Sequence, residues 1–141
     1  MLAQSLLFAA GVSAHAVMQA PDPRRTGPAQ EALCGAAVTK RLENDRAGPI
    51  ENAMEYADAD YKCDAYMCRG YQLEDNLDNV QVFGAGDELA VHIDLIAGHR
   101  PGYANISVID LAANQIIGEP LKSWDDWLSK DPDAPGDERM F

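Results

Sequence analysis

The sequence has little positive charge. Its 141 residues contain 11 Lys and Arg against 23 Asp and Glu, a formal net charge of -12. Residues 51–141 hold the whole imbalance, with nineteen acids and six bases, whereas residues 1–50 hold four acids and five bases. Because nucleic-acid binding needs clustered positive charge against the phosphate backbone, this composition excludes a nucleic-acid partner.

Long hydrophobic runs are also missing. No apolar stretch reaches the roughly 18 to 20 residues that cross a bilayer, so the sequence predicts no membrane-spanning segment. A chain of 141 residues is also too short for more than one ordinary domain. We therefore expect a single globular domain that acts outside the membrane.

The first fourteen residues contain no charged side chain. They have an apolar centre at 6–10, and Val12 and Ala14 stand at the -3 and -1 places of a small-residue cleavage site. This pattern predicts a secretion signal over 1–14, a mature domain over 15–141 with His15 as its first residue, and an extracellular protein. The alternative is that 1–14 forms a buried helix or strand of the fold.

Cysteines are few and odd in number. Cys34, Cys63 and Cys68 are candidates for disulfide bonds, which exported domains commonly use. Three cysteines cannot all pair within the chain, so either one thiol is free or a partner is missing. A zinc site on the Cys63 and Cys68 pair is a weaker alternative, because no second pair or His doublet follows at the spacing of a zinc finger.

Two helical stretches and a loop are predicted in the amino-terminal half. Apolar residues recur at three- and four-residue intervals over 29–42, which is typical of one helix face, and a second weak helical stretch covers 50–57. The segment before these helical stretches contains Pro21, Pro23 and Pro28 and is therefore expected to be irregular and extended. Residues 58–71 are rich in Tyr, Asp and Cys, a composition typical of a loop.

The carboxyl-terminal half predicts strands. Leu89, Val91, Ile93 and Leu95 alternate with polar residues as the buried face of a strand would. Further short strands are expected over 79–83, 103–111 and 115–117, with turns at 84–87 and 112–114. Several short antiparallel strands of this kind favour a mainly β fold, an immunoglobulin-like or fibronectin III-like β-sandwich with short helices in its amino-terminal half.

Histidines are scarce, and the three differ in placement. A mature amino-terminal His15 would offer its α-amine and its ring Nδ1 as a chelating pair, and one further imidazole would complete three nitrogen ligands. Copper suits such a set because of its affinity for nitrogen and its tetragonal preference. His99, in the loop 97–102, is the better candidate for the third nitrogen, since a loop can turn its ring toward the amino terminus. His92 lies inside a strand and is the weaker candidate.

Other motifs carry less weight. Asn105-Ile106-Ser107 is a glycosylation sequon in an exported chain. Trp124 and Trp127 either contact sugar or belong to the core. Acids are too numerous for any pair to be singled out as catalytic, and neither a Gly-x-Ser-x-Gly nucleophile motif nor a complete phosphate-binding glycine loop occurs.

Five segments resemble one known family. They are His-Ala-Val-Met-Gln-Ala-Pro-Asp-Pro-Arg over 15–24, Ala-Leu-Cys-Gly over 32–35, Asp-Ala-Tyr-Met-Cys-Arg-Gly-Tyr over 64–71, Asp-Asn-Val-Gln over 78–81 and Gly-Tyr-Ala-Asn-Ile-Ser-Val-Ile-Asp over 102–110. Together they resemble fungal lytic polysaccharide monooxygenases, of which auxiliary activity family 16 is the most similar type.

The resemblance implies a copper enzyme. His15 would supply the amine and ring nitrogens of a histidine brace, and His99 the third nitrogen, so both are the expected catalytic and metal-binding residues. Members of the family use copper, an external electron donor and dioxygen or hydrogen peroxide to abstract hydrogen at C1 or C4 of a glycosidic linkage. The expected substrate is cellulose or a related β-linked cell-wall polysaccharide, and the expected state is a secreted monomer.

The sequence departs from the family at its end. Family chains continue beyond the point matched by Phe141 with more strands, more cysteines and an axial tyrosine near copper, so we expect a carboxyl-terminally incomplete domain. Two alternatives follow. One is a secreted histidine-brace copper protein without oxidative activity, and the other is a metal-free module that binds cell-wall carbohydrate.

Overall fold

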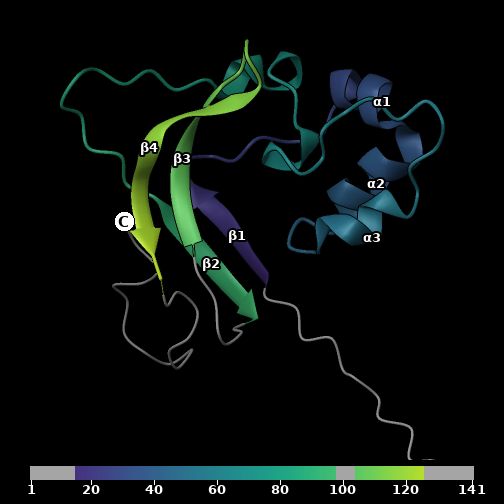
Figure 1. Cartoon of the computed structure of the whole chain (residues 1–141), viewed down its shortest axis with the longest axis horizontal. Coiled ribbons are helices and arrows are strands. Elements are labelled where there is room, and N and C mark those ends of the chain that lie inside the picture. Colours follow the sequence, from purple (N-terminus) through teal and green to yellow (C-terminus); the bar gives the residue numbers. More distant parts are fainter. Residues whose placement is uncertain (1–14, 98–103, 126–141) are drawn as a thin grey trace, which may run out of the picture.

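Helices and strands occupy separate parts of the molecule. The computed structural model describes residues 15–97 and 104–125. In Figure 1 the three α-helices lie to one side and the strands to the other. In order, the elements are β1 (His15–Ala20), α1 (Pro28–Cys34), α2 (Ala36–Asn44), α3 (Ile50–Met54), the 3-10 helices η1 (Cys68–Gly70) and η2 (Glu74–Asn79), β2 (His92–Ala97), β3 (Ala104–Asp110) and β4 (Gln115–Trp124).

The strands form two separate two-stranded sheets. β1 pairs with β2 and β3 pairs with β4, both antiparallel. The predicted immunoglobulin-like or fibronectin III-like sandwich is therefore wrong, and the described residues form a small mixed α/β structure. A sandwich buries apolar side chains between two facing sheets, whereas Val108, Ile116, Ile117 and Leu121 of the β3–β4 pair are 41% to 62% exposed.

The buried core lies among the helices. One cluster joins α1, α2, α3 and the segment that follows them, and its members are Cys34, Val38, Leu42, Ala53, Cys63 and Ala65. Val38 and Leu42 are four residues apart on α2, so one helix face carries both. A disulfide between Cys34 and Cys63 lies inside this cluster and joins the end of α1 to the loop after α3.

Gly35 divides the helix that the apolar spacing predicts over 29–42. Its φ of 83° lies in a region that residues with a Cβ rarely adopt. α1 therefore ends at Cys34 and α2 begins at Ala36 in a new direction. The helix predicted over 50–57 is also present, although α3 is shorter and ends at Met54.

A distant carboxylate caps the first helix. Gly27 at the amino-terminal end of α1 has no capping side chain. Instead, Asp75 of η2 accepts hydrogen bonds from the backbone N–H groups of Ala29 at 2.9 Å and Gln30 at 2.8 Å. A Cβ at Gly27 would collide with the Asp75 carboxylate. The glycine thus admits the acid that satisfies two free donors of the helix and fixes η2 against α1.

Several predicted strands begin or end elsewhere. The expected strand over 79–83 is absent, since η2 covers 74–79 and no strand occurs over 80–91. β2 begins only at His92, and Leu89 is 40% exposed although Val91 is buried. β3 matches the strand expected over 103–111 within its described residues, and β4 extends the one expected over 115–117 as far as Trp124. None of the helices in 15–97 and 104–125 is long and apolar enough to cross a membrane.

Removing the disulfide is expected to destabilise the helical core. Cys34 and Cys63 are 29 residues apart, and closing a loop of that length in the unfolded chain stabilises the folded state by about 3 to 4 kcal/mol. A Cys34→Ala and Cys63→Ala double variant should lose at least this much free energy of unfolding in urea melts, because both positions are also buried. Cys68→Ala is the matched control, since Cys68 is free and exposed. Equal losses in both variants would contradict this role of the disulfide.

Candidate functional site

The pairing of β1 with β2 places the start of the predicted mature chain beside the end of β2. In the antiparallel register His15 pairs with Ala97, and Ala16 pairs with Leu95. His99 follows Ala97 by two residues in the sequence, and two residues of chain span at most about 7 Å. His99, the predicted third ligand, is therefore only two residues along the chain from Ala97, the residue that pairs with His15.

His92 lies at the other end of the same strand pair. It pairs with Ala20, five residues along β1 from His15. At about 3.3 Å per residue, this separates the backbones of His15 and His92 by about 16 Å. The His92 Nε2 atom is 3.3 Å from Oδ1 of Asp94, whose Oδ2 accepts a 2.8 Å hydrogen bond from Gln19. His92 thus belongs to a polar surface group at the far end of the strands.

The fit to copper rests on the donor set and the strand register. The structure describes the backbone of His15, whereas His99 lies outside the described residues. Elsewhere in 15–97 and 104–125, no three His, Cys, Asp or Glu side chains gather as metal ligands would. An α-amine and two imidazoles are donors that copper prefers, and the register pairs His15 with Ala97, which precedes His99 by two residues in the sequence.

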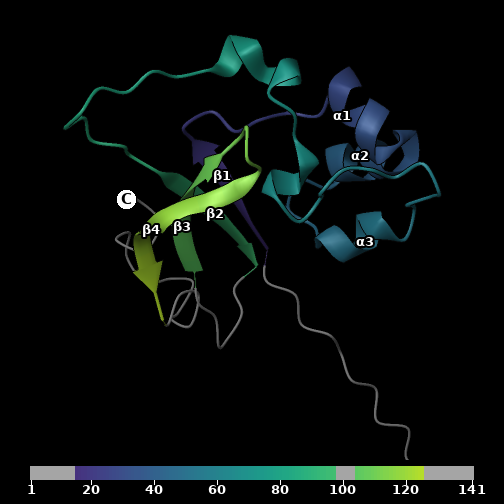
Figure 2. The ribbon, with the colours of Figure 1, turned by 45° about the horizontal axis from the view of Figure 1, so that its top comes forward.

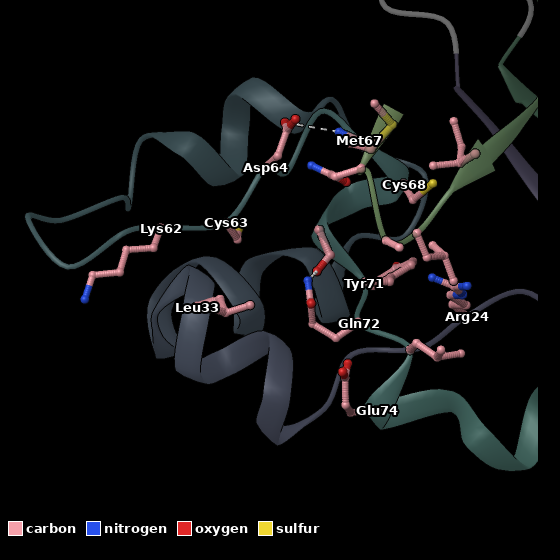
Figure 3. Close-up of a pocket in the computed structure, with 16 residues that line it drawn as sticks. Arg24, Leu33, Lys62, Cys63, Asp64, Met67, Cys68, Tyr71, Gln72 and Glu74 are labelled. Carbon is pink, nitrogen blue, oxygen red and sulfur yellow. Dashed lines mark hydrogen bonds between the residues drawn. The ribbon is translucent and has the colours of Figure 1, made fainter. Parts of the chain in front are cut away.

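Two cavities lie between the helical part and the strands. Their volumes are about 540 and 530 Å³, and five residues line both: Arg24, Cys68, Tyr71, Ile109 and Leu111. Figure 3 looks into the first cavity and draws Arg24, Cys68 and Tyr71 together on the side away from Lys62 and Leu33. Cavities of this size hold small organic ligands.

The three cysteines have different states. Cys34 and Cys63 form the disulfide of the core, whereas Cys68 of η1 is a free and exposed thiol. The alternative of a zinc site on Cys63 and Cys68 is therefore wrong, because the Cys63 sulfur is already bonded to Cys34. Cys68 faces both cavities instead.

The sequon and Trp124 lie on the second sheet. Asn105 is exposed on β3, opposite Ser123 of β4, so an enzyme could reach its amide in an exported chain. Its glycosylation stays a prediction. Trp124 is half-buried at the end of β4, with the Lys122 Nζ atom 5.6 Å from its ring centroid. Trp127 lies outside the described residues.

The sequence patterns did not predict the two cavities. The walls of the second cavity come from β1, from the segment after it, from the turn after α2, from η1 and from β3, which are far apart in the chain. The only signal was the local charge: residues 1–50 are not acidic, and their Arg24 and Arg46 line the second cavity. No pattern of spacing joins those two arginines to Arg69, which completes the group.

Comparisons with known proteins add no family. A scan against protein-family models gives no match. A search of curated proteins also gives none. The functional assignment therefore depends on the motifs of the chain, the order of its histidines and the strand register described above.

Proposed function

We propose that this chain is a secreted, copper-dependent lytic polysaccharide monooxygenase that cleaves cellulose or a related β-linked polysaccharide. The observation that carries the proposal is the pairing of His15 with Ala97, two residues before His99. It supports His15 and His99, rather than His92, as the source of the three nitrogen ligands. The five segments that resemble this family support the reaction itself.

The residues of the chain would hold and orient the metal. The His15 amine and Nδ1 would form a chelate, and the His99 imidazole would complete the nitrogen set; copper, when bound, supplies one-electron chemistry with dioxygen or hydrogen peroxide. β1 would keep the chelate in place, because its backbone is hydrogen-bonded to β2 along the strand. An external donor would deliver the electrons, and a neutral polymer is compatible with a net charge of -12.

Two features agree with an extracellular setting. The Cys34–Cys63 disulfide lies in the core, and disulfides form and persist in oxidising compartments. The exposed Asn105 sequon is available to a glycosylating enzyme during export. Both features support secretion as part of the proposal, together with the apolar stretch over 1–14.

The direct test is the release of oxidised sugars. Protein processed to begin at His15 and loaded with copper should release C1- or C4-oxidised oligosaccharides from cellulose when a reductant and an oxidant are added, as measured by mass spectrometry. Copper-free protein and the His99→Ala variant are the controls and should release none. If copper-loaded protein binds the metal tightly and still releases no oxidised sugar from cellulose or related glucans, the monooxygenase activity is refuted.

One observation favours a second candidate, a secreted copper protein without oxidative activity. The two sheets are separate and their apolar side chains are exposed, so the described residues lack the layered sandwich whose flat face would present copper to a crystalline polymer. Tight copper binding without oxidised products identifies this candidate. Failure to bind copper at all leaves the third, a metal-free carbohydrate-binding module, for which the half-buried Trp124 is the candidate contact.

A further inference from the structure

The second cavity combines apolar walls with positive charge. Val17 and Met18 of β1 and Ile109 of β3 line it, as does the shared Tyr71, so an organic ring or chain would find apolar contacts there. Figure 2 shows β1 and β3 close together beside the helices. Residues of both strands line the cavity. Its volume of about 530 Å³ is therefore large enough to hold a small ring compound.

In 15–97 and 104–125, every charged residue that lines this cavity is an arginine. Arg24, Arg46 and Arg69 contribute to it, and no Asp or Glu of these ranges lines it. The chain as a whole has about twice as many acids as bases, 23 against 11. The first cavity differs, because Asp64 and Glu74 line it together with Lys62. A local excess of three guanidinium groups in such an acidic chain indicates a site for an anion.

Among the residues that the structure describes, no carboxylate neutralises the three guanidinium groups. Arg24 makes no hydrogen bond or ion pair within the described residues, and the same holds for the exposed side chain of Arg46. Arg69 donates only to backbone carbonyls, at 3.0 Å to Gly48 and 2.8 Å to Asp45, and its Nε atom is buried without a partner. By contrast, Arg25 and Arg41 each pair with an aspartate at the surface.

We propose that this cavity binds a small organic carboxylate with an apolar body, such as an aromatic acid. A carboxylate matches the planar fork of a guanidinium group with two parallel hydrogen bonds. The ring or chain would lie against Val17, Met18 and Ile109. The arginines would repel a cation, and an inorganic anion would leave the apolar walls unused. The site requires neither copper nor the histidines, so it is independent of the proposed function.

Binding of trans-cinnamate to the full chain tests this site, with cinnamamide as the uncharged analogue of the same shape. Isothermal titration calorimetry should show cinnamate binding at least about tenfold more tightly, because charge-assisted hydrogen bonds are roughly twice as strong as neutral ones. Arg24→Gln should weaken cinnamate binding about tenfold and leave cinnamamide binding nearly unchanged. Arg46→Gln is a second test and should also weaken cinnamate binding, since Arg46 lines the same cavity and its side chain is exposed.

Arg25→Gln is the matched control. It removes the same charge from the neighbouring residue, whose guanidinium is exposed and pairs with Asp78 outside the cavity. Cinnamate affinity should change less than about twofold in this variant, because exposed ion pairs contribute little. An equal loss in Arg24→Gln and Arg25→Gln would show a general charge effect and overturn the site. Equal affinities of cinnamate and cinnamamide, or no binding of cinnamate, would overturn it as well.

Alkylation of Cys68 provides a second measurement. Its exposed thiol lines the same cavity, so bound cinnamate should slow its reaction with iodoacetamide in the native chain. The protection should disappear in Arg24→Gln and persist in Arg25→Gln. Cinnamate that binds without protecting Cys68 would place the ligand elsewhere and refute the assignment to this cavity.

Discussion

A single extra residue before His15 is expected to abolish tight copper binding. The extension converts the α-amine of His15 into a peptide nitrogen, which removes one of three proposed ligands and the chelate ring that it forms with Nδ1. Loss of an outer-shell partner already costs about 10- to 100-fold in metal affinity, so the loss of a direct ligand should exceed about a hundredfold. This is the largest effect that the proposed site predicts.

Calorimetric titration with Cu(II) measures this effect on two preparations, one that begins at His15 and one that carries a single preceding alanine. Thermal melting without metal is the control, and the two forms should melt alike because the β1–β2 pairing involves residues from His15 onward. Equal copper affinities for the two forms would refute the histidine brace. The result does not depend on the second cavity, because the residues of β1 that line this cavity begin at Ala16 and do not include His15.

Local patterns predicted the helices and one strand pair. The helical spacing over 29–42 and the weaker pattern over 50–57 both appear in the structure, since each reflects contacts within a few residues. The turn expected at 112–114 also lies between β3 and β4, which form a hairpin. Three departures from this part of the prediction are the positive φ of Gly35, which divides one helix into two, the earlier end of α3 and the greater length of β4.

The arrangement of the sheets depends on contacts that alternation does not encode. Leu89 and Val91 show the period of a strand, but a strand forms only where a partner is in register, and β1 reaches no further along β2 than His92. β4 likewise has the composition of a buried strand, although Ile116, Ile117 and Leu121 are exposed. Sequence alternation alone therefore predicted two packed sheets where the structure has two separate pairs.

The histidine site could be proposed from the sequence, whereas the arginine-lined cavity could not. The order of the residues predicts different roles for His99 and His92, and this difference stays a prediction because His99 lies outside the described residues. The three arginines of the second cavity come from the segment after β1, the turn after α2 and η1, and only the folded chain brings them together. The hydrogen bonds from Arg69 to the carbonyls of Asp45 and Gly48 fix two of these segments against each other.

The second large effect is a contrast between two histidine variants. His99→Ala is expected to lose tight copper binding, because it removes the only imidazole proposed to complete the nitrogen set of His15. His92→Ala is expected to keep it, since the His92 backbone lies about 16 Å along the strands from His15 and metal–imidazole bonds are only about 2 Å long. The two substitutions remove the same group, an imidazole.

Electron paramagnetic resonance of the copper-loaded proteins distinguishes the two variants, because hyperfine coupling reports how many nitrogens bind the metal. The His92→Ala protein should retain the three-nitrogen spectrum, and the His99→Ala protein should show fewer nitrogens and weaker binding. Substitution of His92 removes its contact with Asp94, yet that pair is half exposed, so a change of less than about 1 kcal/mol in stability is expected. A three-nitrogen spectrum that survives in His99→Ala and disappears in His92→Ala would reverse the assignment, and it would require the end of β1 near Ala20 to approach His15 against the observed register.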